Sequence, residues 1–241
     1  MRADLPPGVV LRRSARALRC ALRLDAAAGC VALVLPARTP MEAGARFAWS
    51  RAAWVARVLS ALPPPVPFAD GATLPVAGRA VRIFVEPGAG GSGVAIDGGV
   101  LRVRLAAGAA DPAPAVARFL RAEARRALGA LLAEKAAALG APTPALSVRD
   151  TRSRWGSCAP GPGARVTLSL RLILAPPAAA DYVVAHEAAH LVHAGHTRAF
   201  WALCRDLSAD YAAGRAWMRD HGPGLLRYGA AVTPPPARGG R

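Results

Sequence analysis

HEAAHLVHAGH, residues 186–196, contains four of the chain's five histidines and one glutamate. His186 and His190 are four residues apart, so in a helix they project from one face, about 6 Å apart along the axis. That spacing lets both imidazoles reach a single zinc ion, while Glu187 lies a little further round the helix, close to an open coordination position. The stretch therefore predicts a helix that carries a catalytic metal site.

The third ligand of such a site is either His193 or His196. His193 would lie roughly 10 Å along the axis from His186, nearly in line with the first two ligands, whereas a tetrahedral site needs a ligand from another direction. Gly195 can adopt the left-handed conformation that ends a helix, and the resulting bend would bring His196 back over the metal. We expect His186, His190 and His196 to be the ligands. His193 is expected at the rim of the site.

The glutamate of the motif has a role in such chemistry. Zinc makes a bound water acidic enough to ionise near neutral pH, and an adjacent glutamate can take the proton and pass it to the leaving group. Glu187 has this position in HEAAH. The alternative, that these are ordinary residues of a buried helix, leaves Glu187 costly to bury without a partner. The motif therefore favours a zinc-dependent hydrolase.

The composition is that of a folded protein and bears on its location. The chain has 241 residues, 53% of them hydrophobic, which disfavours disorder. No run approaches the about 18 uninterrupted apolar residues of a membrane span. Arginines interrupt the N-terminal stretch MRADLPPGVVLRRSARALRCALRL, which is not typical of a secretory signal. We expect no membrane association and a cytoplasmic location.

The cysteines do not form a recognisable framework. Cys20, Cys30, Cys158 and Cys204 are widely spaced and include no CxxC pair. A zinc ribbon is therefore excluded, and a disulfide scaffold is not expected at this size in a reducing compartment. We expect free thiols that are mostly buried.

The charge is strongly positive. The net charge is +16, from 30 arginines and a single lysine against 15 acidic residues. This balance is compatible with accessory contact to nucleic acid. It is also compatible with a base-composition bias that replaces lysine by arginine, and no block of five or six like charges decides between the two.

Periodicity and turn residues predict the elements of the first half. A β-hairpin is expected over ARALRCALRLDAAAGCVALVLP, residues 15–36, with its turn at DAAAG. A helix with a capping box of Thr39 and Glu42 is expected to run to about Ala61, where PPPVP stops it. Two strands, TLPVAGRAVRIFVEP and GVLRVRLA, are expected before a long helix over about Val116–Leu139.

The second half is predicted to contain two strands and then helices. LSVRDTRSRWGSC, residues 146–158, is expected to form one strand, and VTLSLRLIL, residues 166–174, another with alternate apolar residues on one face. A helix opened by Pro176 and Pro177 is expected to carry the histidine motif and to run to about Val192; its apolar residues occur all round, as in a buried helix. Short helices are expected around RAFWALCRDL and DYAAGRAWMRDHG, and TPPPARGGR is expected to be disordered.

Four stretches carry a resemblance to a known family: RSRWGSC, LSLRLILAPP, DYVVAHEAAHLVHAGHTRAFW and DYAAGRAWMRDHG. Together they resemble the YgjP-like family of predicted zinc metallopeptidases, also called metal-dependent hydrolases and related to SprT-like proteases. The resemblance implies a zincin-like α+β fold, with a small mixed sheet and an active-site HExxH helix, preceded by a β-hairpin and a helix. It also implies His186, His190 and His196 as zinc ligands and Glu187 as the catalytic acid/base.

The resemblance extends from the first hairpin to about Tyr228 and suggests a domain organisation. Residues 1–14 would be an N-terminal tail, and residues 15–228 the metallopeptidase domain. The catalytic core would take about 114–228. Residues 229–241 would be a disordered tail rich in proline, glycine and arginine.

RSRWGSC is distinctive but has no evident chemistry of its own. In zincins a strand edge near the active helix holds an extended peptide by backbone pairing, and residues 152–158 are the candidate. Arg154 could stabilise a developing oxyanion, and we expect Arg154 and Trp155 to bind substrate. The alternative is that Trp155 and Cys158 only pack the sheet against the helix.

We therefore expect a zinc metallopeptidase that cleaves peptide bonds in protein or peptide substrates, with a metal-activated water and Glu187 as general base. The alternative is a nucleic-acid-associated zinc protein, which includes a DNA-recruited SprT-like protease. Glu187 disfavours a purely structural zinc, because a structural site has no use for a base and normally fills all four positions.

Overall fold

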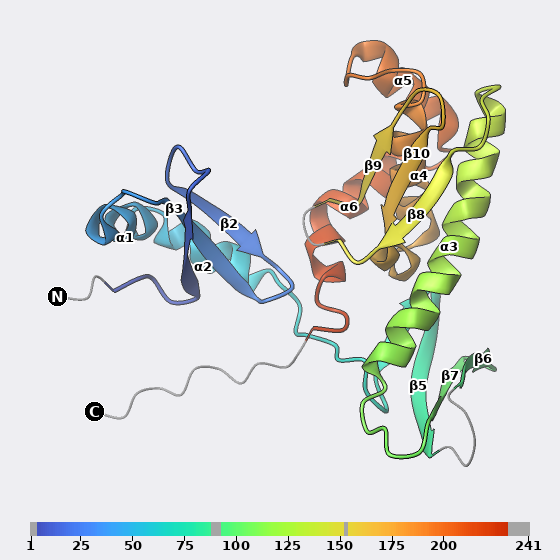
Figure 1. Cartoon of the computed structure of the whole chain (residues 1–241), viewed down its shortest axis with the longest axis horizontal. Coiled ribbons are helices and arrows are strands. Elements are labelled where there is room, and N and C mark those ends of the chain that lie inside the picture. The colour runs from blue at the N-terminus through green and yellow to red at the C-terminus, as the bar shows by residue number, and fades with distance from the viewer. Residues whose placement is uncertain (1–3, 88–92, 152–153, 231–241) are drawn as a thin grey trace. The chain divides into compact units, whose positions relative to one another are not determined.

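A computed structural model of the chain describes residues 4–87, 93–151 and 154–230 (Figure 1). Contacts divide these residues into two compact units, 4–65 with Ala230 and Val66–Gly229. Each unit combines helices with small sheets, so the predicted α+β class is confirmed. None of the helices in the described ranges is long and apolar enough to cross a membrane.

A three-stranded sheet of order β1-β3-β2 lies at the centre of the first unit. β2 (Ala21–Asp25) and β3 (Cys30–Pro36) form the predicted hairpin, and Gly29 in its turn has a φ of 67°, which glycine adopts without strain. β1 (Val9–Ser14) pairs with β3 in parallel. These residues fall within the expected N-terminal tail but form a strand, because their backbone groups complete the hydrogen bonding of the second edge of β3.

Two helices replace the single helix predicted after this hairpin. α1 (Met41–Trp49) and α2 (Ala52–Ser60) are separated by Ser50 and Arg51. The Ser50 hydroxyl donates to the carbonyl of Phe47 at 2.8 Å, and Arg51 leaves the helical region with a φ of −119°. Serine interrupts the helix here because its hydroxyl competes with the backbone for hydrogen bonds.

The start of α1 also differs from the prediction. Pro40 is its N-cap residue, and no side chain caps the helix. The predicted capping box of Thr39 and Glu42 is therefore wrong, because Thr39 lies one residue too early for its hydroxyl to reach the first free amides.

The second unit begins with a four-stranded sheet of order β4-β5-β7-β6. The first predicted strand is in fact a hairpin of β4 (Thr73–Val76) and β5 (Arg79–Pro87), whose turn includes Gly78 with a φ of 79°. β7 (Val100–Leu105) confirms the second predicted strand. β6 (Gly93–Asp97) pairs with β7 and was not predicted, because five residues between glycine-rich stretches carry too little periodicity.

The long helix α3 (Ala113–Ala138) confirms the prediction and begins slightly earlier. The carboxylate of Asp111 accepts the amide hydrogen of Ala113 at 2.9 Å, which explains the earlier start. Buried residues recur along one face of α3, among them Leu120, Leu128 and Leu132. This face contacts β7 and also packs against α4 (Pro177–Ala189).

A second, mixed sheet has the order β8-β10-β9. β8 (Ala145–Arg149) is parallel and β9 (Gly156–Ala159) antiparallel to the central β10 (Arg165–Ser169). The segment predicted as one strand over residues 146–158 therefore forms two strands on opposite sides of β10, and residues 152–153 lie outside the described residues. This arrangement makes β9 an edge strand.

The strand predicted over residues 166–174 ends at Ser169. Its remainder is the 3₁₀ helix η1 (Leu170–Leu174), which begins where the Ser169 hydroxyl accepts the amide hydrogen of Arg171 at 3.4 Å. Every residue of η1 is buried, so alternating leucines could not distinguish a strand from this turn. The Arg171 guanidinium is buried as well and pairs with Asp150 at 2.9 Å.

Three helices complete the second unit. α4 carries the histidine motif and is buried nearly all round, as predicted, but it ends at Ala189, before the expected end at Val192. α5 (Arg198–Leu207) and α6 (Tyr211–Leu225) confirm the two short helices, and both contact α4. Most of the expected C-terminal tail, residues 231–241, lies outside the described residues.

All four cysteines are free, as predicted. Only Cys204 is buried, so the expectation of mostly buried thiols is wrong. Cys20, Cys30 and Cys158 are half-buried because they lie in or next to strands of small sheets, whereas Cys204 lies on the inner face of α5.

Candidate metal centre

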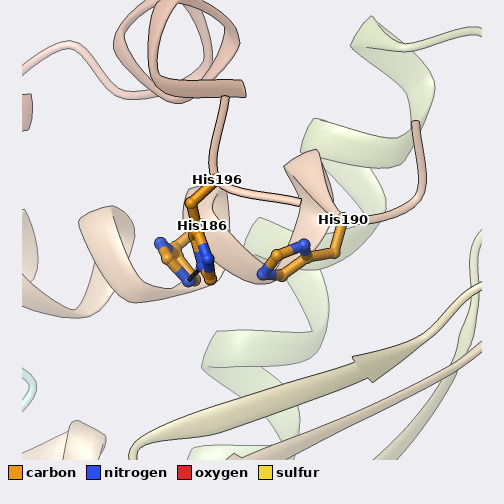
Figure 2. Close-up of side chains that lie close together, drawn as sticks. All are labelled: His186, His190 and His196. Carbon is orange, nitrogen blue, oxygen red and sulfur yellow. Dashed lines mark hydrogen bonds between the residues drawn. The ribbon is translucent and has the colours of Figure 1, made fainter. Parts of the chain in front are cut away.

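The three predicted ligand histidines lie together (Figure 2). His186 is in the last turn of α4, His190 is its C-cap residue, and His196 precedes Thr197, the N-cap residue of α5. One ring nitrogen from each lies within 4.8 Å of the others. Figure 2 shows the three rings pointing toward one another from the helix and from the segment that follows it. The structure therefore brings these three donors to one place.

A tight turn after α4 redirects the chain toward the cluster. The amide of His193 donates to the carbonyl of Ala189 at 2.9 Å, and the amide of Thr197 donates to the carbonyl of Gly195 at 2.9 Å. Gly195 is not among the glycines with positive φ. The predicted left-handed bend at Gly195 is therefore wrong: the turn directly after Ala189 has already changed the chain direction.

The tautomer of His190 is set by a backbone carbonyl. Its Nδ1 lies 3.0 Å from the carbonyl oxygen of His193. A carbonyl only accepts hydrogen bonds, so Nδ1 carries the proton and Nε2 of His190 keeps a free lone pair. The side chain of His193 does not belong to the cluster. This residue contributes to the arrangement through its backbone.

The chemistry and spacing of the other two rings fit a metal ion. Burial, followed by the charges of His190 and His196, lowers the pKa of His186 to about 4, so its ring is neutral at physiological pH. Nε2 of His186 lies 3.2 Å from Nε2 of His196. In a tetrahedral zinc site with Zn–N bonds of about 2.05 Å, two ligand nitrogens are about 3.3 Å apart. Nδ1 of His186 is buried without a hydrogen-bond partner among the described residues, so this ring meets another polar group only through Nε2.

Aromatic side chains hold the three rings from behind. Phe200 is fully buried, and its ring centroid lies between 4.6 and 5.0 Å from those of the three histidines. Trp201 stacks on His196 with centroids 5.5 Å apart and an interplanar angle of 26°. The N-terminus of α5 places both aromatic residues, since the Thr197 hydroxyl caps it by accepting the amide hydrogen of Phe200. Packing against Phe200 and Trp201 therefore orients the donor rings.

Glu187 is buried next to the cluster. It is 6% exposed, and its side chain lies against the backbone of Gly156 in β9. Burial raises the pKa of Glu187 to about 7, and the positive charge of Arg154 partly opposes this shift. A carboxyl group with such a pKa can accept and release a proton near neutral pH.

A pocket of about 380 Å³ lies over the cluster. Residues of β9, α4 and the turns after them line it: Gly156, Ser157, Cys158, Pro160, His186, Glu187, His190, Ala194 and His196. Burial, assisted by the charge of Glu187, raises the pKa of Cys158 to about 11. The thiol therefore stays protonated at neutral pH and is not a ready metal ligand.

The two residues predicted to bind substrate have different positions. Arg154 is exposed, and its charge acts on Glu187. Trp155 does not line the pocket; its indole lies against Gly222 of α6, and its carbonyl accepts the amide hydrogen of Ser169 at 2.8 Å. The alternative, that Trp155 and Cys158 only pack the sheet against the histidine-bearing helix, is not what the structure shows either: Trp155 faces α6, and Cys158 lines the pocket.

Sequence reasoning did not identify Gly156, the residue that faces Glu187. The available signal was a glycine in a stretch predicted to be a strand, which often marks a place where another group approaches the backbone closely. The proximity of β9 to α4 could not be predicted from the spacing of the two segments along the chain.

Comparisons with known proteins agree with this geometry. A family model described as YgjP-like, metallopeptidase domain, matches residues 20–221, which is most of the chain. The matched range includes the histidine cluster, Glu187 and Gly156. No curated protein and no solved structure matches the chain.

Proposed function

The chain belongs to the YgjP-like metallopeptidase family, and on this premise we propose that it is a zinc-dependent peptidase of the zincin type, acting on protein or peptide substrates. The observation that carries the proposal is the convergence of His186, His190 and His196 beside the buried carboxyl group of Glu187. Three imidazoles and a carboxyl group in one pocket are the groups that metal-assisted hydrolysis requires.

His186, His190 and His196 would hold the zinc ion through their ring nitrogens. The low pKa of His186 favours the neutral ring that binds metal, and the hydrogen bond from His190 to a backbone carbonyl fixes the orientation of the His190 ring. Three protein ligands are typical of catalytic zinc, whereas structural zinc normally has four. When bound, zinc supplies Lewis-acid chemistry that polarises a carbonyl group and acidifies water.

Glu187 would be the general base. Its side chain lies between α4 and β9 and lines the pocket beside the histidines. With its raised pKa, the carboxylate would take a proton from the attacking water and pass it to the nitrogen of the departing amine. This transfer lets the peptide bond break without releasing a charged leaving group.

β9 would hold the substrate in an extended conformation. It is an edge strand, and Gly156, Ser157 and Cys158 line the pocket. A peptide could add to the unpaired edge by backbone hydrogen bonds. Arg154 is exposed close to Glu187 and would stabilise negative charge that develops on the carbonyl oxygen.

Zinc content and peptide hydrolysis, measured on the same preparations, test this function. Glu187→Gln should keep zinc and lose at least about 100-fold in kcat, because it removes only the base. His196→Ala should lose zinc. The matched control is His221→Ala, which removes a histidine of α6 outside the cluster and should change neither quantity. Wild-type activity in Glu187→Gln would exclude the proposed mechanism.

A peptidase recruited to DNA is the second candidate. Arg118, Arg121 and Arg125 are exposed along α3 at spacings that place them on one helix face, and the net charge of the chain is +16. Such a face favours phosphate binding. Binding to duplex DNA should then weaken steeply with salt, and Arg121→Ala should reduce the salt slope by about 1. Absence of binding at low salt would remove this candidate.

A further inference from the structure

Gly156, the first residue of β9, has no space for a side chain. A Cβ built on it would lie 2.5 Å from both Cγ and Oε1 of Glu187, and 2.7 Å from its Cδ. Carbon atoms in contact are ordinarily about 3.5–4.0 Å apart. Gly156 does not have a positive φ, so its backbone conformation would accept another residue. The requirement for glycine at this position is therefore steric and comes from Glu187.

β9 is held in place by partners other than Glu187. Gly156 pairs with Leu168 of β10, and the Trp155 carbonyl accepts the amide hydrogen of Ser169 at 2.8 Å. The indole of Trp155 faces Gly222 in α6, where an added Cβ would lie 3.5 Å from it. The strand cannot retreat from α4 without breaking these contacts.

The α4 backbone beside Glu187 is held as well. Ala185, Ala188 and Ala189, the neighbours of Glu187 along the helix, are all buried. The atoms nearest to a Cβ on Gly156 are Cγ, Oε1 and Cδ of the glutamate, which rotation about its side-chain bonds can move. Rotation about the Cα–Cβ bond of Glu187, which moves Cγ and the carboxyl group together, is therefore the least costly response to a side chain at position 156.

We propose that Gly156 is a positioning residue for Glu187: its missing side chain lets the backbone of β9 approach α4 and sets where the carboxyl group stands relative to the three histidines. This role depends on the proposed function of Glu187 as the base. The positioning role explains why RSRWGSC contains a glycine. The role is steric, because Gly156 acts only through the Glu187 side chain that it accommodates.

Gly156→Ala tests the role in the zinc-loaded protein. Zinc content should equal that of the wild type, since no ligand is displaced. The kcat for a peptide substrate should fall about 10- to 100-fold, as expected when a catalytic group is misplaced by about 1 Å. KM should change by less than about threefold, because the substrate contacts remain.

Two other glycines provide matched controls. Gly93 begins strand β6, and Gly195 lies next to His196; a Cβ on either would have nothing within 4 Å, and neither has a positive φ. Gly93→Ala and Gly195→Ala should therefore keep the wild-type zinc content and kcat. These controls separate the effect of the contact with Glu187 from a general effect of alanine in a strand or beside the site.

A second measurement does not use activity. Gly156→Ala should lower the Tm in the wild-type background through overpacking. The Glu187→Ala background lacks the three crowded atoms. The Tm loss caused by Gly156→Ala should therefore be at least about 2 °C smaller in this background than in the wild type. The difference between the two backgrounds measures the contact directly.

The outcomes distinguish this role from the proposed function. A wild-type kcat in Gly156→Ala, or an equal Tm loss in both backgrounds, would overturn the positioning role. Loss of zinc from Gly156→Ala would also overturn it, since the glycine would then serve the histidine cluster. If the wild-type protein hydrolyses no peptide, the proposed function fails, and the Tm comparison still decides whether Gly156 positions the side chain of Glu187.

Discussion

Replacement of Phe200 by leucine should weaken zinc binding more than a core substitution of similar cost. Phe200 is fully buried, and its ring centroid lies 4.6 Å from that of His190, 4.7 Å from that of His196 and 5.0 Å from that of His186. One side chain thus supports all three donor rings. Groups that orient metal ligands are typically worth about 10- to 100-fold in metal affinity.

The buried carbons and ring contacts that Phe200→Leu removes determine the loss in free energy of unfolding. Leucine has three fewer side-chain carbons than phenylalanine, or about 2.4 kcal/mol at about 0.8 kcal/mol per buried carbon. The lost ring contacts with the histidines add to this cost, and the packing that leucine retains offsets them. We expect the free energy of unfolding to fall by about 2–4 kcal/mol, which a protein of ordinary stability survives. The zinc affinity should fall about 10- to 100-fold.

Urea unfolding would report the stability, and competition with a zinc chelator of known affinity would report the binding. The matched control is Leu128→Ala in α3: Leu128 is buried and does not line the histidine pocket. This substitution should cost about 2–5 kcal/mol of stability and leave the zinc affinity unchanged. Wild-type zinc affinity in Phe200→Leu, or an equal loss in both variants, would refute the reasoning.

Three further predictions concern residues outside this contact. Lys135, the chain's only lysine, is buried, and its Nζ lies 2.6 Å from a carboxylate oxygen of Asp181. Lys135→Met should lower the free energy of unfolding in urea by about 2–4 kcal/mol, because it leaves the Asp181 charge without this partner. Adding Asp181→Asn should restore part of that loss. Burial alone would lower the pKa of Lys135, but Asp181 and Glu134 raise this pKa above its ordinary value of 10.5. The stability that charged Lys135 contributes is therefore fully present below pH 10.5. Thermal melts should show its loss as the pH rises through the pKa of the folded protein. Gly214→Ala would place a Cβ 2.8 Å from a Cβ of α4 and should lower the Tm by several degrees, whereas Gly129→Ala, whose nearest contact is 3.5 Å away, should leave it unchanged or raise it. His193→Ala should keep zinc, because this residue supports a ligand ring through its backbone carbonyl; an empty site would show that its imidazole is a ligand.

Local patterns predicted the elements that depend on neighbouring residues. The β2–β3 hairpin followed from alternation and a glycine turn, and the start of α4 followed from the prolines before it. Spacing in HEAAHLVHAGH also identified the three histidines that the structure brings together. These features are determined over a few residues, where helical or extended geometry fixes which side chains share a face.

Patterns failed where packing chose between two local conformations. VTLSLRLIL is typical of a strand, but Ser169 starts a 3₁₀ turn, and the buried Arg171 pairs with Asp150 and donates to the carbonyl of Leu225. The bend before His196 was predicted at Gly195, but the turn after Ala189 makes it. In each case the competing conformations satisfy the same local preferences, and distant partners decide.

The sequence by itself determined which chemical groups are available for a metal site, because two histidines four residues apart share a helix face whatever surrounds them. Only the tertiary structure decided which residues from other segments pack beside these histidines and Glu187. Phe200 lies beneath the donor rings, and Gly156, which belongs to a separate strand, lies against Glu187. The approach of β9 to α4 depends on side-chain volumes in two segments that are distant in the chain. Local sequence periodicity therefore cannot predict how closely these segments lie in space.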